Sequence, residues 1–332
     1  MQFQTNPIQF KFKYVRNNQA SGVFSQKGLL DHQGLTLAQN TISYHNIAAV
    51  QILDNRLVLV LSDVRQLSDK AINLLINNNI LVIEVYKTNT LELKVMINRV
   101  LSQKEAEAIR QQLISNDRSN FFAIVNCPQC QATIDQSERE RTRYIYCRFC
   151  ETIFQPGSPL ITNGMNYRIC GDCNMFDRIS GYTEFYFYFL LVVYGFSYKR
   201  RHVCDNCANR IFWKTLFANL IFVLGVPFSI YVKIKSMIGR DANLQELAKA
   251  NSLASKGKYQ EAAVIYSRLQ QNYPEHPGLL LSQGLGHLTG NDIQGAINCF
   301  NRSLKACNNY SPAVDLISRL QQAAKSQVVG RS

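Results

Sequence analysis

Four pairs of cysteines, each with two residues between its members, constrain this chain more than any other feature. They use eight of the ten cysteines in 332 residues. The pairs are Cys127 and Cys130, Cys147 and Cys150, Cys170 and Cys173, and Cys204 and Cys207. A Cys-x-x-Cys pair forms a tight turn, or knuckle, that offers both thiolates to one tetrahedral metal ion. Four knuckles therefore predict two four-sulfur metal sites.

Disulfide bonds are the alternative use of so many cysteines, and they need an oxidising compartment. Residues 1–12 (MQFQTNPIQFKF) lack the charged start, the apolar core and the small-residue cleavage site of a secretory signal. We therefore expect a cytoplasmic protein that binds two Zn²⁺ ions. A catalytic zinc site keeps an open coordination position and usually includes a histidine or a carboxylate, whereas eight sulfurs close both sites. Both ions are predicted to be structural.

The pairing of the knuckles is open at the level of sequence. The gaps between consecutive knuckles are 16, 19 and 30 residues. Consecutive pairing gives one zinc ribbon at 127–150 and a second at 170–207, while nested or cross-braced pairing satisfies the same chemistry. Four knuckles and the basic stretch Lys199–Cys204 (KRRHVC) resemble the cross-braced FYVE finger and its lipid-binding motif. In that family the motif precedes the second knuckle, whereas here it precedes the fourth.

The chain is strongly basic, with a formal net charge of +13 and a pI near 9.3. Its 46% hydrophobic and 18% charged residues are typical of globular proteins, and its length allows several domains. Much of the excess positive charge lies between residues 199 and 240. The predicted basic patch comprises Lys199, Arg200, Arg201, Arg210, Lys214, Lys233 and Lys235. Such a cluster indicates an acidic partner surface, either anionic lipid or nucleic acid.

The N-terminal part is predicted to be a β-domain. Phe10, Phe12 and Tyr14 alternate with lysines, as in a strand with one buried face. Further strands are expected at 41–52, 57–61, 80–86 and 91–97, with a hairpin turn at 88–90 and a helix that begins at Ser102 as its N-cap. Antiparallel strands closed by one C-terminal helix resemble a bacterial pleckstrin-homology-like (PH-like) domain. We place this domain at residues 1–118.

The two ribbons are expected at residues 119–165 and 166–210. The second contains a run of twelve uncharged residues, 185–196 (FYFYFLLVVYGF), rich in aromatic and β-branched side chains. One interpretation is a long β-hairpin that turns or bulges at Tyr194–Gly195. The other is a segment that dips into a bilayer. If Cys170 and Cys204 bind one ion, both ends of the run lie on the same side of the membrane, and twelve residues are too few to cross it.

A knuckle, an apolar segment and the closing sequence His202–Cys207 (HVCDNC) resemble the LITAF-type zinc domain over residues 170–207. That resemblance implies that the apolar run inserts into membrane. The first knuckle here lacks the proline usual in that family, and the insert is shorter.

An apolar segment follows at 211–240, predicted to be helical and interrupted by Gly225 and Pro227. Lys214 is the only charge between residues 211 and 232. Its 18 uncharged residues 215–232 are at the lower limit for a membrane-spanning helix, and an interfacial or re-entrant helix fits equally well. A helix packed against the ribbon hairpin is the alternative without membrane contact. The residues expected to contact membrane are Phe187, Leu191, Trp213, Phe222 and Tyr231.

Residues 241–332 repeat at a period of 34. The repeated framework comprises Ala250, Gly257, Ala262, Tyr266, Gly284, Ala296 and Phe300. Leu253 to Pro274 resembles a tetratricopeptide (TPR) repeat, and the second copy departs from the family by placing Asn308 where the first has Pro274. The resemblance implies an α-helical array with a capping helix at 312–325 and a groove that binds a protein partner. Two repeats are fewer than the three such arrays usually need.

The sequence contains no catalytic constellation: the histidines are scattered, and there is no phosphate loop or nucleophile elbow. We therefore expect a multidomain α+β protein without an enzymatic role or an evident small-molecule substrate. It is predicted to be a zinc-stabilised adaptor at the cytoplasmic face of a membrane. The alternative is a soluble zinc protein that binds nucleic acid, indicated by interleaved basic and aromatic residues at 139–148.

Overall fold

The computed structural model describes most of the chain, which divides into two compact units at residues 138 and 139. The described ranges are 7–158, except 18, 23, 54, 66 and 87, and then 167–190, 193–220 and 245–329. Unit 1 comprises residues 1–138 and unit 2 residues 139–332. Each unit is considered by itself.

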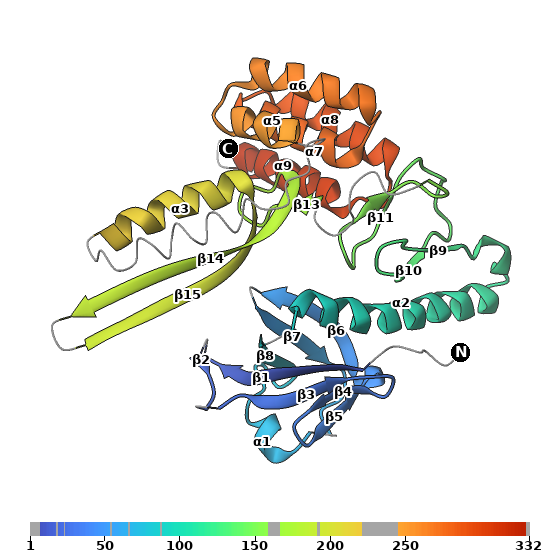
Figure 1. The fold of residues 1–332 in the computed structure, drawn as a ribbon. Helices are drawn as coiled ribbons and strands as arrows, with labels where there is room; N and C mark the ends of the chain where they lie inside the picture. The colour runs from blue at the N-terminus through green and yellow to red at the C-terminus, as the bar shows by residue number, and fades with distance from the viewer. Residues whose placement is uncertain are drawn as a thin grey trace. The chain divides into compact units, whose positions relative to one another are not determined.

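Unit 1 is built on a curled antiparallel sheet (Figure 1). Its strands are β1 (Ile8–Arg16), β2 (Gln19–Ala20), β3 (Gln26–Leu30), β4 (Gly34–Leu37), β5 (Asn40–Ser43), β6 (Ile47–Leu53), β7 (Arg56–Leu61) and β8 (Ile80–Tyr86). They pair in the order β5-β4-β3-β1-β8-β7-β6, and β2 pairs with β1. The expected strands at 57–61 and 80–86 are confirmed. Alternate residues of β1 and β8 are buried, because successive side chains of a strand point to opposite faces.

One long helix, α2 (Thr90–Ser115), covers part of this sheet and packs against β6. Its buried face includes Leu93, Met96, Ile97 and Leu101, which join the core of the sheet. The short helix α1 (Asp69–Ile72) lies between β7 and β8 in the chain. A small hairpin of β9 (Ile124–Asn126) and β10 (Thr133–Asp135) completes the unit.

The prediction of a strand at 91–97, a hairpin turn at 88–90 and a helix start at Ser102 is wrong. The helix begins twelve residues earlier, and the Asn89 side chain caps it by accepting a hydrogen bond from Leu91 N at 3.0 Å. Residues 91–97 alternate like a strand, but Leu93, Ile97 and Leu101 also recur at helical spacing, and burial of that face decides for the helix. Ser102 is inside the helix, where its hydroxyl accepts a hydrogen bond from Thr133 N at 2.9 Å.

Unit 2 begins with short strands and continues into a long β-hairpin. The elements are β11 (Ile145–Tyr146), β12 (Ile153–Phe154), β13 (Tyr167–Ile169), β14 (Phe176–Leu190), β15 (Val193–Cys204) and α3 (Asp205–Leu220). β14 and β15 pair from Ile179 opposite Cys204 to Leu190 opposite Val193. Helix α3 packs along this hairpin (Figure 1).

The hairpin interpretation of residues 185–196 therefore holds for the backbone, but the turn is not at Tyr194–Gly195. Tyr194 pairs with Phe189 and Gly195 with Tyr188, so the strands reverse beyond Leu190 and before Val193. The glycine sits in regular pairing, where the sequence suggested a turn or a bulge.

The rest of unit 2 consists of antiparallel helix pairs. The helices are α5 (Gln245–Ser255), α6 (Tyr259–Asn272), α7 (Pro277–Thr289), α8 (Ile293–Ala306) and α9 (Ser311–Val329). Helix α5 pairs with α6 and α7 with α8, and α9 packs on α8 (Figure 1). The 34-residue period thus corresponds to one helix pair.

The repeated framework residues form the interior of these pairs. Ala250, Ala262, Tyr266, Ala296 and Phe300 are each fully buried. At Gly284 a Cβ would lie 2.4 Å from the Phe300 ring, so a larger residue would force this buried ring to shift. Gly257, at the end of α5, has a φ of +76°, a conformation that glycine adopts without strain.

Candidate metal centres and their surroundings

The eight knuckle cysteines gather into two groups. One is formed by Cys127, Cys130, Cys147 and Cys150, and the other by Cys170, Cys173, Cys204 and Cys207. Within each group the sulfur atoms all lie within 4.8 Å of one another, and seven of the eight residues are buried. This is the consecutive pairing; the nested and cross-braced arrangements do not occur. Four thiols at this separation fit a tetrahedral Zn²⁺ ion, so the residues present suit two structural zinc sites.

The first three knuckles share one backbone design. In the third, Cys170 N donates to Met175 O and Asn174 N donates back to Cys170 O, both at 2.9 Å. The residue after the second cysteine then has a positive φ: 60° at Gln131, 64° at Glu151 and 58° at Asn174. This left-handed residue reverses the chain so that both sulfurs of a knuckle point to the same place. The sequence did not predict this left-handed conformation, because only one of the three residues is an asparagine and none is a glycine.

The fourth knuckle is built differently. Cys204 is the last residue of β15 and Cys207 lies in the first turn of α3. The Cys204 amide points toward the opposite knuckle, with N to Cys170 Sγ at 3.4 Å. Hydrogen bonds from the other thiols lower the pKa of Cys170 and raise that of Cys204, as expected when four thiols share protons. A bound divalent ion displaces those protons and favours the thiolate at every ligand.

Arginines of the predicted basic patch are engaged around the second site. Arg210 Nη2 lies 2.8 Å from Asp172 Oδ2 and 3.9 Å from Cys207 Sγ. Arg201 forms an ion pair of 2.7 Å with the buried Glu184 and a longer contact with Asp172. A Zn²⁺ ion with four thiolates has a net charge of −2, so nearby arginines offset it. These two residues therefore act within the ribbon, and Lys214 is exposed.

The predicted membrane-contact residues are only partly within the described chain. Trp213 is 49% exposed on α3, where its ring lies 6.1 Å from that of Phe217, itself 65% exposed. Phe187 pairs with Phe196 through the backbone of the hairpin. The side chains of Phe187, Lys199 and Arg200, and the residues Leu191, Phe222, Tyr231, Lys233 and Lys235, lie outside what the structure describes.

Across the ranges the structure describes, helices are too short or too polar to traverse a bilayer. No protein-family model, curated protein or solved structure matches the chain.

The helical array holds the start of strand β14. The Phe176 ring packs so closely on Gly278 that a Cβ there would lie 2.4 Å from it. Ser282 Oγ accepts a hydrogen bond from Phe176 N at 2.9 Å and donates to Phe176 O at 3.3 Å. Asn251 Nδ2 donates to the same carbonyl at 3.0 Å. Side chains of α5 and α7 thus recognise the main chain and the ring of one extended residue of the second ribbon.

The first ribbon is held in a similar way by the turn between α8 and α9. Asn309 Oδ1 accepts from Tyr146 N at 2.9 Å, and its Nδ2 donates to Tyr146 O at 2.8 Å. Asn308 Nδ2 donates to Glu140 O at 2.7 Å. Asn308 is the position where the second repeat departs from the first, so the departure coincides with a docking contact.

Two buried titratable groups lie at this junction. Burial raises the pKa of Asp177 to about 7, although its carboxylate accepts hydrogen bonds from Asn251 Nδ2 and Arg178 N. His276 packs between the rings of Tyr144 and Phe176, and burial lowers its pKa to about 4. Both groups are therefore close to neutral in the interior at mildly acidic pH.

The aromatic residues of the 139–148 stretch are not available for stacking on bases. Tyr144 is 1% exposed and Tyr146 is 6% exposed, both inside the shared core. Their rings contact His276 and Tyr310. The tyrosines of the interleaved pattern are therefore part of the core, while Arg139, Arg141, Arg143 and Arg148 are exposed.

Proposed function

We propose that the protein is a zinc-stabilised, non-enzymatic scaffold whose second ribbon presents the apolar end of the β14–β15 hairpin to a membrane. The observation that carries this proposal is the length of the hairpin. At about 3.3 Å per residue, the strands extend roughly 35 Å from the Cys204 end to the Leu190–Val193 pair. The uncharged run 185–196 forms that distant half.

The base of the hairpin supports the same proposal. A two-stranded hairpin alone has little stability in water. Here the second cysteine group, which would hold a metal ion, lies at one end, and α3 packs along the strands. The exposed pair Trp213 and Phe217 adds aromatic side chains of the kind that favour the membrane–water interface. Four reduced thiols in each group suit the cytoplasmic face.

The remaining parts fit an adaptor. The curled antiparallel sheet followed by helix α2 supports the proposal that unit 1 is PH-like. The helix pairs at a 34-residue period support the proposal that the helical array is TPR-like. A protein partner that used the face of α5 and α7 would have to displace Phe176 from Gly278 and Ser282. The array therefore binds the second ribbon of the same chain. A protein partner must either displace Phe176 or bind to another surface of the array.

Nucleic-acid binding is the weaker alternative. Tyr144 and Tyr146 are buried, and Arg201 and Arg210 are paired with carboxylates of the ribbon. Binding to a polyanion rests on basic side chains that are free to reach phosphates. The ion pairs of Arg201 and Arg210 within the ribbon reduce the number of basic side chains that can reach phosphates.

Flotation with vesicles tests the membrane proposal. We expect the zinc-loaded chain to float with phosphatidylcholine–phosphatidylserine vesicles and to stay bound in 1 M salt (~3 Å screening length), because burial of apolar surface does not depend on charge. The double variant F187D and L191D should lose flotation, since a charged side chain inside a bilayer is strongly unfavourable.

Val264→Asp is the control, because Val264 is 63% exposed on α6 and an aspartate there adds negative charge to unit 2 outside the hairpin. This variant should float like the wild type. Flotation of the folded double variant would contradict insertion of the hairpin. Soluble protein with salt-sensitive retention on DNA or RNA would support the alternative instead.

A further inference from the structure

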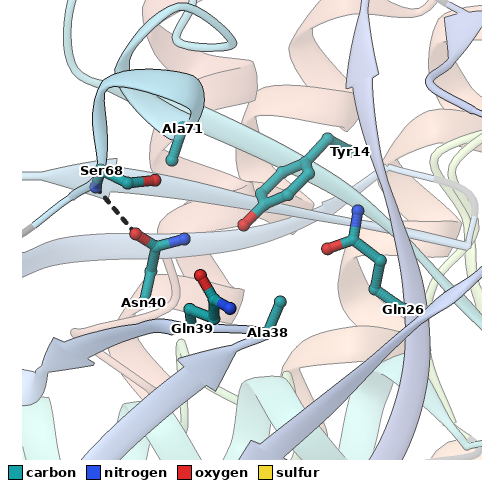
Figure 2. A pocket seen from close by; sticks show the side chains of 7 residues that line it. All are labelled: Tyr14, Gln26, Ala38, Gln39, Asn40, Ser68 and Ala71. Atoms are coloured by element: carbon teal, nitrogen blue, oxygen red, sulfur yellow. Dashed lines mark hydrogen bonds between the residues drawn. The ribbon is translucent and has the colours of Figure 1, made fainter.

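Unit 1 contains a pocket of about 280 Å³ on the sheet, and no cysteine lines it. It is lined by Tyr14, Gln26, Ala38, Gln39, Asn40, Ser68 and Ala71 (Figure 2). The lining comes from β1, the start of β3, the turn between β4 and β5, and the segment that begins α1. Its volume is near the lower end of small-molecule binding sites.

The Tyr14 hydroxyl is the feature that indicates a ligand. Tyr14 is 6% exposed, and its ring belongs to the hydrophobic core of the sheet. Its hydroxyl points into the pocket on the side of Asn40 (Figure 2), is buried, and makes no hydrogen bond of good geometry with the described residues. An unpartnered buried hydroxyl is unfavourable by about 1–3 kcal/mol. The neighbouring Tyr44, equally buried, instead donates to Asp31 O at 2.6 Å.

The turn that forms one wall is also unusual. Ala38 is the first of two residues between the paired Leu37 and Asn40, and its φ is +56°. Glycine is favoured at this position of a tight hairpin, and alanine there is strained by about 1 kcal/mol. The strained residue places its methyl group in the pocket wall. Asn40 is fixed on the other side, because its Oδ1 accepts a hydrogen bond from Ser68 N at 2.8 Å (Figure 2).

The chemistry of the lining selects the class of ligand. None of the seven residues is charged, so the pocket offers no ion pair to a phosphate, a carboxylate or an ammonium group. Tyr14, Gln26 and Gln39 each carry groups that both donate and accept hydrogen bonds. Sugar hydroxyls do the same, and neighbouring hydroxyls can satisfy a carboxamide and a phenol together.

We propose that this pocket binds an uncharged, polyhydroxylated molecule of the size of a monosaccharide, with the Tyr14 hydroxyl and the Gln26 and Gln39 carboxamides as its hydrogen-bonding groups. Ala38 and Ala71 supply the apolar contact with the carbon side of the ring.

Ligand-observed NMR on the full zinc-loaded chain tests this proposal. The probes are glucose, galactose, mannose, N-acetylglucosamine and myo-inositol, with acetate and methyl phosphate as contrasts. We expect saturation transfer to at least one polyol and to none of the contrasts. Gln39→Ala, an exposed position, should weaken binding without loss of fold.

Tyr14→Phe separates a binding role from a structural one. It should weaken polyol binding about tenfold, equivalent to about 1.4 kcal/mol, while the melting temperature of unit 1 does not fall, because the hydroxyl makes no hydrogen bond of good geometry with the protein. Tyr44→Phe is the matched control: it removes the bond to Asp31, so it should lower the melting temperature and leave polyol binding unchanged. The proposal is overturned by binding of none of the polyols, by binding of a contrast compound instead, or by equal polyol affinity of Tyr14→Phe and the wild type.

Discussion

The two units build their hydrophobic cores in different ways. In unit 1 the core comes from residues 10–101, which comprise the strands of the curled antiparallel sheet and the first half of α2. In unit 2 one core joins residues 144–176 of the zinc ribbons to residues 247–313 of the helical array. The first core lies within one continuous stretch of the chain, although β1 pairs with the distant β8 inside it, whereas the second joins two stretches that are separated by the β14–β15 hairpin and α3. The difference indicates that the ribbons are structural parts of the array.

This comparison explains how two helix pairs can suffice. Helical repeats usually need three or more copies, because each copy buries its apolar face against the next. Here Tyr144, Tyr146 and Phe176 from the ribbons pack into the array core. The ribbons supply apolar surface that a further repeat would otherwise provide, so metal binding and array stability should be linked.

Removing the second metal site gives the largest expected effect. The variant C204S and C207S should retain one Zn²⁺ ion instead of two and should lose the unfolding transition of unit 2, while the sheet of unit 1 still melts cooperatively. The reason is that a structural zinc contributes about 10–16 kcal/mol in small domains, and this site holds the ribbon that carries Phe176. Metal analysis and calorimetry measure the two results.

Cys299→Ser is the control for that experiment, because Cys299 is buried in α8 but belongs to neither cysteine group. It should keep both ions. If the unit 2 transition survived loss of the second ion unchanged, the array would be independent of the ribbon, and the contrast between the two cores would be wrong.

The contact between Phe176 and Gly278 gives the next largest effect. Phe176→Ala should destabilise unit 2 by about 3–5 kcal/mol through the cavity it leaves. Gly278→Ala should destabilise it by about 1–3 kcal/mol, because the new methyl group meets the Phe176 ring. The double variant should be more stable than the sum predicts, since the methyl enters the vacated space. Denaturant unfolding measures all three values.

Gly290→Ala is the matched control, because the nearest atom to its Cβ would be 3.4 Å away and its φ is ordinary. Its stability should stay within about 1 kcal/mol of the wild type. Strict additivity in the double variant would mean that ribbon and array do not share a core.

The parts that sequence predicted are those with a short, fixed spacing. Two residues between cysteines, alternation along β1 and β8, and a 34-residue period are each visible without knowing what lies opposite in space. The burial of Ala250, Tyr266 and Phe300 follows from the last of these. Consecutive pairing was the favoured arrangement of the knuckles, but the gaps left nested and cross-braced pairings open, and the positions of the sulfur atoms decide.

The parts that sequence missed depend on contacts between distant residues. Residues 91–97 fit a strand and a helix equally well, and the Asn89 cap with the sheet beneath it selects the helix. Ser282 and Asn251 are 106 and 75 positions from Phe176, so no local pattern links them. The Tyr14 pocket likewise joins four separate segments. These contacts define the junction and the pocket, and they appear only once the chain is folded.

The pH dependence of unit 2 gives the smallest effect, and it arises at the junction that distinguishes the two cores. Asp177 has a raised pKa, so its contribution to stability is present below its unfolded value of 3.8 and is lost as the pH rises through about 7. His276 has a lowered pKa, so its contribution is present above its unfolded value of 6.5 and is lost as the pH falls through about 4. Between pH 4 and 7 the two trends oppose each other.

Single substitutions should therefore expose a pH dependence of the stability of unit 2 that largely cancels in the wild type. Relative to the wild type at each pH, His276→Phe should lose about 1–2 kcal/mol of stability as the pH rises from 5.5 to 7.5, because it lacks the gain that His276 gives the wild type, while the Asp177 trend is common to both proteins. The stability of Asp177→Asn relative to the wild type should instead rise with pH over the same range, whatever the substitution costs in stability at any one pH. The comparison at equal pH matters, because acid also protonates the metal-binding thiolates in every variant. Equal slopes in both variants would show that neither group stays buried at the ribbon–array junction, whereas opposite slopes require that both do.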